Sequence, residues 1–404
     1  MSTLMSDPSR QEAAELWRTA LSQSGWRGTC AVEEVKVVEA MDRVTAQPIV
    51  AVRPVPHYAA SAMDGYAVRS SDTQIATPEA PIDLRLVSLG EEVSAGTAAR
   101  VDTGDALPKG ADSVIMQEYV TVQDGRIEIS AAIIPGRHVR QIGEDIMTGE
   151  MVLPTGRIIG PADIAAVLAA GDDRIRVIAC PRVTVIPTGD EIVDSAAELA
   201  QGTIRDINSY MLSALFASWG AKVRRHPIVP DDPDCLREAI DFSLRESDLV
   251  VTIAGTSGGT EDFTRAVMDS LGQVCCHGVA IRPGRPVLLA VIGGKPVVGL
   301  PGYPVSCMLT AELFLHDMIY EFQRKEPPEQ RIIQARLAQD TRSKLGVEEF
   351  VRVALTTGTP YADATVPARG ASLVSTLTQA NGWLRIAANV EKIDAGAIVE
   401  VELF

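Results

Sequence analysis

The sequence has few of the features typical of nucleic-acid and membrane binders. Its 404 residues carry 37 Lys and Arg against 53 Asp and Glu, a net charge of −16, so a broad basic surface is excluded, although a local basic pocket is not. No apolar run approaches the roughly 20 residues of a membrane helix. Residues 1–12 also lack the apolar core of a signal peptide. We expect a soluble cytoplasmic protein that binds neither nucleic acid nor membrane.

Cysteine and aromatic residues are also sparse. The six cysteines form no CxxC pair and no His pairing at zinc spacing, and the vicinal Cys275–Cys276 pair lies in an apolar stretch, so small buried core residues are expected. Aromatics are 4% of the chain, whereas there are 32 Gly and 24 Pro, which favours loops and tight turns. Hydrophobic residues, at 46%, suffice for two to four domains of roughly 100–200 residues each.

The chain changes texture along its length. Residues 10–24 read as an amphipathic helix, and residues 31–175 as short β-branched runs broken by Gly and Pro, with one helix at 161–170. From 181 to 325 strands and helices alternate, which predicts a doubly wound parallel sheet. After the charged stretch 324–331 the short strands return, which predicts a small C-terminal β domain.

Helix signals in the alternating region are clear. Asn208 is expected to cap a helix that ends at Gly220, and Asp232 to cap a helix that starts with Pro233. Residues 221–229 are expected to form a strand.

Ligands of open α/β sheets bind at the carboxyl ends of the strands, where four segments of this region fall. Residues 187–191 read equally well as a turn or as a pair of acids for a metal. The glycine-rich residues 255–262 suit an anion at a helix N-terminus, although Asp262 reads equally as an N-cap.

The other two segments contain rigid prolines. Residues 281–286 place Arg282 and Arg285 around a Pro-Gly turn, which favours an oxyanion or phosphate site over a solvated hairpin tip. At 299–306, Pro304 starts a helix, so the amides of the two following residues could form an oxyanion niche, with an ordinary Pro-started helix as the alternative. Together the four segments predict an anionic substrate with a divalent metal.

Six motifs in register resemble those of the molybdopterin molybdenumtransferase family, to which the gephyrin E domain is related. They are Ser61-Ala-Met-Asp-Gly-Tyr-Ala67, Thr103-Gly104, Gly143-Glu-Asp-Ile146, Thr188-Gly-Asp-Glu191, Asp206-Ile-Asn-Ser-Tyr-Met-Leu212 and Leu300-Pro-Gly-Tyr-Pro-Val-Ser306. The resemblance covers nearly the whole chain.

The resemblance implies a homodimer of four-domain subunits, of mixed α/β and β class. An extended linker domain would combine residues 1–50 and 147–180, and a β domain at 51–146 would be inserted into it. Residues 181–326 would form a three-layer molybdopterin-binding α/β domain with a parallel sheet. Residues 327–404 would form the C-terminal β domain.

The implied reaction takes adenylylated molybdopterin and molybdate, releases AMP and leaves the metal on the dithiolene, with Mg²⁺ as cofactor. Glu191 and Asp262 would hold the metal, and both would act in catalysis with Asp64 and Thr103, which face the cleft of the partner subunit. The implied binding residues are Gly255, Ser257, Gly258, Gly259, Asp231, Asp232, Arg282, Arg285, Pro301, Pro304, Ser306, Arg352 and Ser375.

Four positions depart from the family pattern. Arg282 and Arg285 stand where Lys is common, Tyr303 replaces Asn, and Ala371 replaces a Ser, with Ser375 nearby. The glycine loop reads Gly-Thr-Ser-Gly-Gly over 255–259. These changes surround the implied anion site, so we hypothesise an unusual preference between molybdate and tungstate.

Two other functions compete with metal insertion. The fold could serve as a non-catalytic pterin-binding or scaffold module, although Asp64, Thr103, Glu191 and Asp262 favour the enzyme. The same α/β domain also serves adenylyltransferases that load AMP onto molybdopterin, and such an enzyme is also a conceivable partner. That function predicts ATP consumption.

Overall fold

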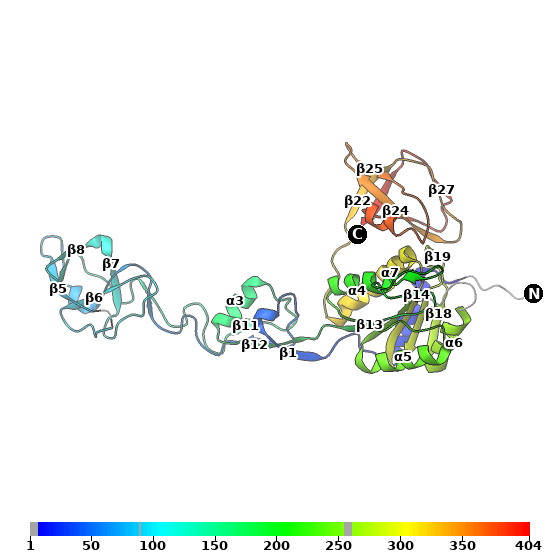
Figure 1. Ribbon diagram of the computed structural model, residues 1–404. Helices are drawn as coiled ribbons and strands as arrows, with labels where there is room; N and C mark the ends of the chain where they lie inside the picture. The colour runs from blue at the N-terminus through cyan, green and yellow to red at the C-terminus, as the bar shows by residue number, and fades with distance from the viewer. Residues whose placement is uncertain (1–6, 89, 254–260) are drawn as a thin grey trace, which may run out of the picture. The chain divides into compact units, whose positions relative to one another are not determined.

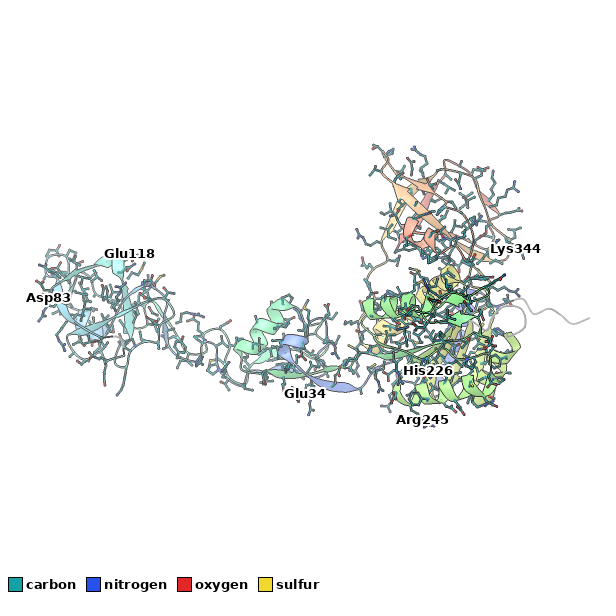
Figure 2. The ribbon with its side chains drawn as sticks, viewed as in Figure 1. Glu34, Asp83, Glu118, His226, Arg245 and Lys344 are labelled. Atoms are coloured by element: carbon teal, nitrogen blue, oxygen red, sulfur yellow. The ribbon has the colours of Figure 1, made fainter. Side chains whose placement is uncertain are left out.

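The computed structural model describes residues 7–88, 90–253 and 261–404, with the side chains of 261 and 262 left out. The chain forms two compact units, one made of the residues up to Ala31 with Ile178–Phe404, the other of Val32–Val177. In the described part of the chain, no helix has the length and apolar character needed to span a bilayer. Charged side chains such as Asp83, Glu118 and Arg245 project from the surface (Figure 2).

The first unit is built on a six-stranded sheet. Its strand order is β16 (Lys222–Arg225), β13 (Arg182–Pro187), β17 (Leu249–Ile253), β21 (Lys295–Leu300), β20 (Leu288–Ile292) and β18 (Gln273–His277). The first four strands are parallel neighbours. The carboxyl ends of β13, β17 and β21 therefore meet at one edge, as the sequence predicted.

Helices cover both faces of this sheet, as expected for a three-layer domain. Figure 1 shows α5 (Pro233–Glu246) and α6 (Glu261–Leu271) on one side, and α4 (Asn208–Ser218) and α7 (Pro304–Phe322) on the other. Successive strand residues alternate between the layers because side chains in a strand point to opposite faces. Val251 packs with the α7 side and Val250 with the α5 and α6 side.

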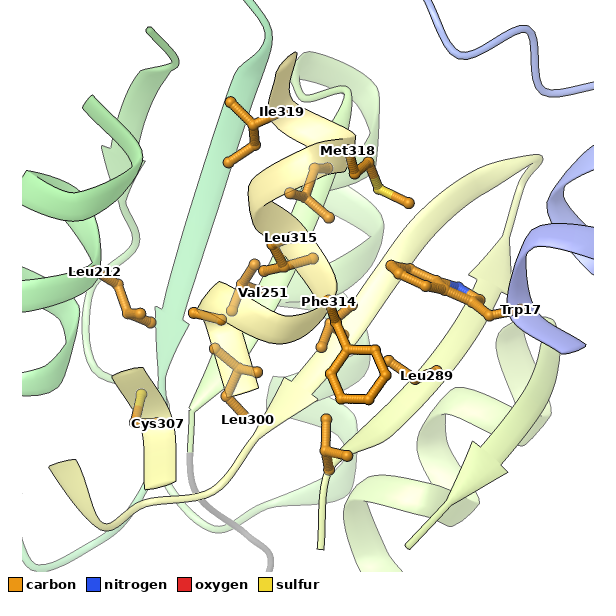
Figure 3. Packing of buried hydrophobic residues seen from close by; sticks show 14 of the residues in the cluster. Trp17, Leu212, Val251, Leu289, Leu300, Cys307, Phe314, Leu315, Met318 and Ile319 are labelled. Atoms are coloured by element: carbon orange, nitrogen blue, oxygen red, sulfur yellow. The ribbon is translucent and has the colours of Figure 1, made fainter. Parts of the chain in front are cut away.

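Helix α1 (Arg10–Gln23) completes the α7 layer. Figure 3 shows Trp17 of α1 beside Phe314, Leu315 and Met318 of α7, over the sheet. Trp17 is buried, and its indole N–H donates to the carbonyl of Ala290 at 2.8 Å, so the N-terminal helix is tied to β20. A Ser9 and Glu12 capping box starts the helix.

The sheet is not wholly parallel, which corrects the sequence-based prediction. Strand β20 runs antiparallel to both β21 and β18. The cause is the two-residue connection Gly293-Gly294, whose φ angles of +57° and +74° match the tight turns that join antiparallel strands. This turn signal was present in the sequence.

Two further local expectations were wrong. Asn208 is the first residue of α4, not its cap; the carboxylate of Asp206 accepts the Ser209 N–H at 3.0 Å and does the capping. The strand expected at 221–229 ends at Arg225, because Pro227 cannot donate a ladder hydrogen bond. Asp232 caps α5 as predicted, accepting from two backbone amides at 2.9 Å.

The C-terminal β domain is a sheet that closes on itself. β24 (Glu348–Thr356), β25 (Ala362–Thr365), β22 (Ile332–Leu337), β28 (Ile398–Leu403) and β26 (Gly382–Ile386) pair in that order, and β26 pairs back to β24. The short β19 (Ile281–Arg282), which lies between β18 and β20 in the chain, adds to β24 in parallel. The segment that carries Arg282 is thereby joined to the C-terminal domain.

The second unit contains a mixed six-stranded sheet and a smaller region of paired short strands. The sheet order is β7 (Ser113–Met116), β4 (Gly65–Val68), β6 (Thr97–Val101), β5 (Ile82–Val87), β9 (Arg126–Ile129) and β8 (Val120–Gln123). In the smaller region, β1 (Val32–Lys36) pairs with β12 (Arg174–Ile178), and β2 (Ile49–Val50) with β11 (Met151–Leu153). The helix α3 (Pro161–Ala169) packs there, so distant stretches of chain share one core.

Candidate active site

Three acids gather where β13 ends. The hydroxyl and amide of Thr188 both donate to the Ile253 carbonyl, at 2.9 and 3.1 Å, which fixes the start of the loop. The Asp190 carboxylate then accepts the Asp231 N–H at 3.1 Å. Partial burial raises the pKa of Asp231, and the charges of Asp190 and Glu191 raise it further. The loop is therefore a concentration of negative charge.

The chemistry of this loop suits a hard cation. Within residues 7–88, 90–253 and 261–404, no group of three or more His, Cys, Asp or Glu is placed to hold a metal by itself. Mg²⁺ does not need such a cage, since it binds through one or two carboxylates together with substrate oxygens and water. Glu191 and its acidic neighbours fit that requirement, while the side chain of Asp262 lies outside the described residues.

The start of α4 is tied to the turn before α7. The side-chain amide of Asn208 donates to the Gly302 carbonyl at 2.6 Å, whereas its carbonyl oxygen is buried with no hydrogen-bond partner in the described chain. Pro301 and Pro304, on either side of Gly302, are buried. The motifs around Asn208 and Pro304 thus form one local structure, although 94 residues separate Asn208 from Gly302.

The amide niche predicted at the start of α7 is partly filled. Pro304 opens the helix as expected, but the Val305 N–H donates to the Ala371 carbonyl of the C-terminal domain at 3.1 Å. The niche prediction is therefore wrong for Val305, because the helix end docks on another part of the protein. Tyr303, which replaces the usual Asn, is 55% exposed and makes no side-chain cap.

A cavity of about 310 Å³ lies between the cationic turn and the C-terminal domain. Four of the predicted binding residues line it: Arg282, Arg285, Ser306 and Arg352. The turn brings the first two, α7 the third and β24 the fourth. The β19–β24 pairing is what assembles them, since it places Arg282 directly beside Glu349.

Arg352 is the most unusual of these side chains. It is 6% exposed, and its two terminal nitrogens donate to the carbonyls of Gly370 and Ala368 at 3.1 and 3.3 Å. Its Nε has no partner in the described chain, and no ion pair there neutralises it. Burial, together with the charge of Arg369, lowers its pKa. A buried guanidinium held only by neutral carbonyls is a strong attractor for an anion.

The other arginines share few carboxylates. Arg369 donates to Glu349 at 2.6 Å, and the Arg282 Nε lies 3.7 Å from the same Glu349 oxygen. Arg285 donates to Asp7 at 2.6 Å. Two arginines therefore compete for one oxygen, and the cavity wall keeps a surplus of positive charge.

Gly284 lets the cationic turn approach α7. Its φ is +105°, and a β-carbon there would lie 2.5 Å from the Thr310 methyl group. Only glycine combines that backbone conformation with that contact. The packing of the turn thus requires glycine at position 284.

Several predicted residues lie elsewhere or outside the described chain. Ser375 begins the short helix α8 (Ser375–Gln379), is exposed and does not line the cavity. The carboxylate of Asp232 caps α5, which lowers its pKa. Gly255, Ser257, Gly258 and Gly259 are outside the described residues.

Asp64 and Thr103 meet in the second unit. The amide and hydroxyl of Thr103 both donate to one Asp64 oxygen, at 2.7 and 2.8 Å. These two bonds lower the pKa of Asp64 and hold the carboxylate ionised at an exposed turn. The two residues that the resemblance pairs functionally are thus in direct contact with each other.

Three contributors to the cavity were missed from sequence. Arg369 and Glu349 line it, and Asp7 holds Arg285. The only signal for Glu349 was its place next to Glu348 at the start of a strand that also carries Arg352. Asp7 could not be predicted, because 278 residues separate it from Arg285.

The comparisons with known proteins agree with this architecture. Residues 9–171 match the MoeA N-terminal region (domain I and II), residues 184–321 the probable molybdopterin binding domain, and residues 334–404 the MoeA C-terminal region (domain IV). Together these matches extend over most of the chain.

Individual relatives are similar over more than nine-tenths of their length. A Methanocaldococcus jannaschii protein named for molybdopterin biosynthesis is 35% identical, and the molybdopterin molybdenumtransferase of Haemophilus influenzae is 31% identical, each over 92% of this chain and 92% or 94% of the relative. The crystal structure of the molybdopterin biosynthesis MoeA protein from Pyrococcus horikosii superposes with a TM-score of 0.78 at 32% identity, covering 98% of this chain and 99% of that one. The chain therefore belongs to the MoeA, or molybdopterin molybdenumtransferase, family.

Proposed function

We propose that this protein is an enzyme that inserts molybdate into adenylylated molybdopterin and releases AMP, the last step of molybdenum-cofactor assembly. The single observation that carries the proposal is buried Arg352, whose guanidinium is held by two carbonyls at the wall of a cavity lined also by Arg282, Arg285 and Ser306. A relative named molybdopterin molybdenumtransferase matches this chain over 94% of its own length.

The arginine cavity holds an oxyanion, either molybdate or the phosphate of the pterin substrate. Arg282 and Arg352 supply fixed positive charge, and Ser306 can offer a hydroxyl. Donors already in position stabilise the charge that develops when an oxyanion is delivered, because no reorganisation is needed during the reaction. Pro301 and Pro304 shape the adjoining turn.

The acidic loop holds the divalent cation. Glu191, with Asp262, would bind Mg²⁺ through carboxylate oxygens, and Asp231 would lie against the same charge. When bound, Mg²⁺ supplies Lewis-acid stabilisation of the phosphoanhydride that is split. The chain's own acids hold the cation and orient the adenylylated end of the substrate, and Gly255, Ser257, Gly258 and Gly259 contact its phosphate.

The protein works as a homodimer of four-domain subunits in the cytoplasm. Asp64 and Thr103 act in the cleft of the partner subunit, where the ionised Asp64 is already oriented by its two bonds from Thr103. The domains follow the boundaries predicted from sequence: 1–50 with 147–180, 51–146, 181–326 and 327–404. A molybdopterin adenylyltransferase would supply the substrate directly.

The decisive experiment measures AMP. The full chain is incubated with adenylylated molybdopterin, Mg²⁺ and either molybdate or tungstate, and AMP is followed by chromatography. We expect AMP release that requires both the oxyanion and Mg²⁺, and the ratio of the two oxyanions gives the metal preference. No AMP above the rate without oxyanion would leave a non-catalytic pterin-binding module, and ATP consumption with free molybdopterin would indicate an adenylyltransferase.

A further inference from the structure

Glu349 is the acidic member of the arginine cavity. It is 4% exposed, and its Oε1 accepts from Arg369 at 2.6 Å with the Arg282 Nε at 3.7 Å. Its Oε2 is buried and has no hydrogen-bond partner among residues 7–88, 90–253 and 261–404. A buried carboxylate oxygen without a donor is costly, so the cavity is complete only when something donates to it.

No described donor of the cavity reaches this oxygen, although the Arg352 Nε is also buried without a partner. The other terminal nitrogen of Arg369 donates to the Arg342 carbonyl at 2.6 Å, and Arg352 donates to the carbonyls of Gly370 and Ala368. Because Glu349 lines the cavity, its occupant can supply the missing donor. Yet an occupant attracted by these arginines is an anion, whose oxygens also only accept.

A carboxylate oxygen and an oxyanion oxygen both only accept, so they can form a hydrogen bond only if a proton lies between them. We propose, on the basis of the oxyanion assignment made under the proposed function, that Glu349 determines the specificity of the cavity. Its Oε2 and the bound oxyanion share one proton, taken up from solvent, in an O–H···O hydrogen bond. The cavity therefore accepts basic tetrahedral oxyanions such as molybdate and tungstate, accepts hydrogen phosphate with the proton that it already carries, and rejects sulfate.

Basicity is the property that separates these anions. Sulfate and molybdate share a tetrahedral shape and a charge of −2, so the arginines attract both. Sulfate is the weaker base, so placing a proton between it and a carboxylate costs more free energy. Without that proton, the ionised Glu349 repels sulfate inside a cavity where burial strengthens the repulsion.

Several charged side chains lie around Glu349. Arg282 and Arg369 face its carboxylate, and Arg352 lies three residues along the same strand. The neighbouring Glu348 is paired separately with Arg10 and Arg385, and Asp7 is occupied by Arg285. A bound dianion brings further negative charge against Glu349, and the proposed shared proton offsets that repulsion.

The test is equilibrium binding of molybdate and of sulfate to the full chain by calorimetry in metal-free buffers. Two buffers of different ionisation enthalpy report proton uptake, and measurements run from pH 6 to 8. We expect sulfate to bind at least about tenfold more weakly than molybdate. One proton should enter per molybdate, and the affinity should fall by about tenfold per pH unit on the alkaline side.

Glu349→Gln supplies the missing donor from its amide. It should bind sulfate about tenfold to a hundredfold more tightly than the unchanged chain, and bind molybdate without proton uptake. The matched control is Glu348→Gln. It also removes one carboxylate charge, but from the neighbouring residue, whose side chain pairs with Arg10 and Arg385 instead. The control should keep both the discrimination and the proton uptake.

The inference is overturned if the unchanged chain binds sulfate as tightly as molybdate, if proton uptake persists in Glu349→Gln, or if molybdate binds only when Mg²⁺ is added. The measurements on the unchanged chain suffice even if the variant fails to fold. AMP release without discrimination against sulfate defeats this inference alone. Discrimination without AMP release defeats the proposed function alone, and failure to bind either anion together with no AMP release defeats both.

Discussion

The acidic loop after β13 and the arginine cavity beside β24 gather charge of opposite sign. In the loop, Asp190, Glu191 and Asp231 lie close together, and no ion pair neutralises them within the described chain. In the cavity, Arg282 and Arg369 compete for one Glu349 oxygen, and Arg352 has only carbonyl partners. The acidic loop therefore lacks a cation, and the cavity holds more arginines than the carboxylates that pair with them.

The difference identifies which ligand each region awaits. Clustered like charges cost stability in the free protein, and they are offset when the right ion binds. A cation suits the loop and an oxyanion suits the cavity, as the two halves of a metal-assisted phosphoanhydride cleavage require. The protein is acidic overall, yet its positive charge is concentrated where an anion should bind.

The largest expected effect on AMP release comes from removing one charge from the arginine cavity or one from the acidic loop. Arg352→Gln should lower AMP release by about a hundredfold or more, because a fixed donor for the oxyanion is lost. Glu191→Gln should lower it comparably by weakening the cation site. Titrations of molybdate and Mg²⁺ separate them: Arg352→Gln should raise the molybdate requirement, and Glu191→Gln the Mg²⁺ requirement.

Arg385→Gln serves as the control for the Arg352→Gln and Glu191→Gln variants. Arg385→Gln removes a positive charge from the same domain, at a half-exposed side chain that pairs with Glu348, and should leave both titrations unchanged. Circular dichroism checks that each variant folds. If Arg352→Gln shifts the Mg²⁺ titration as strongly as the molybdate titration, the division of the two regions by ligand charge is wrong.

A second prediction concerns the shape of the cavity. Gly284→Ala should destabilise the protein by about 2 kcal/mol, since the added methyl would lie 2.5 Å from Thr310 Cγ2 and φ is +105°. Chemical denaturation measures the loss. Oxyanion binding should weaken as the turn is displaced, whereas Mg²⁺ binding at the acidic loop should not change.

Thr310→Ser in the same chain distinguishes the two causes. It removes the clashing methyl and keeps the hydroxyl that donates to the Ser306 carbonyl at 2.7 Å. The double variant should therefore recover part of the lost stability, with the φ strain remaining. No recovery would mean that the turn does not approach α7 as closely as described.

The sequence predicted the acidic loop and the cationic turn. It did not predict that the cationic turn forms a cavity together with the C-terminal domain. Local signals were sufficient for the α5 cap at Asp232 and for the Pro304 start of α7. Arg369 and Glu349 were missed because they join Arg282 only through the β19–β24 pairing, which has no local signal. The Val305 amide was misassigned for the same reason, as its acceptor, Ala371, belongs to another domain.

Two wrong predictions, the direction of β20 and the cap of α4, concern features for which the sequence did contain a signal. The Gly293-Gly294 turn directly predicts the antiparallel β20, but the repeated strand–helix pattern favoured a parallel sheet. Asp206 and Asn208 are both good cap residues, and only the packing of Asn208 against Gly302 decides between them. The six motifs still predicted the family, because each is local.

Glu312 shows the effect of burial on a carboxyl pKa with little contribution from neighbouring acids. Glu312 of α7 accepts from the indole N–H of Trp383 at 2.8 Å, and burial raises its pKa from 4.5 to about 7, with Glu402 adding to the rise. A raised carboxyl pKa means that the folded state holds the proton more tightly. Stability is therefore highest below pH 4.5 for this group and is lost as pH rises through 7.

Glu312→Gln should remove that pH dependence. The unchanged chain should lose about 2 kcal/mol of unfolding free energy from this group between pH 5 and 7.5. The variant should not show this loss, because glutamine still accepts from Trp383 without ionising. Denaturation at the two pH values measures the difference. Glu402→Gln, which leaves Glu312 buried, should keep most of the dependence, and an unchanged slope in Glu312→Gln would contradict the assignment.

The smallest effect is expected in the acidic loop itself. Asp231→Asn should stabilise the free protein at pH 7 by only about 0.5 kcal/mol, because solvent screens an exposed carboxylate. Since the folded pKa of Asp231 is raised, the unchanged chain loses stability as pH rises through it, and asparagine does not. The gain should shrink in high salt, which screens repulsion from Asp190 and Glu191.

Asp232→Asn is the matched control. Asp232 is the residue after Asp231, and asparagine caps α5 about as well as aspartate does. It should change stability little at any salt concentration. Mg²⁺ should stabilise the unchanged chain more than Asp231→Asn, since the ion offsets a repulsion that the variant has already removed. Equal Mg²⁺ stabilisation of both would show that the loop's negative charge serves no cation, and the contrast with the arginine cavity would then rest on the cavity alone.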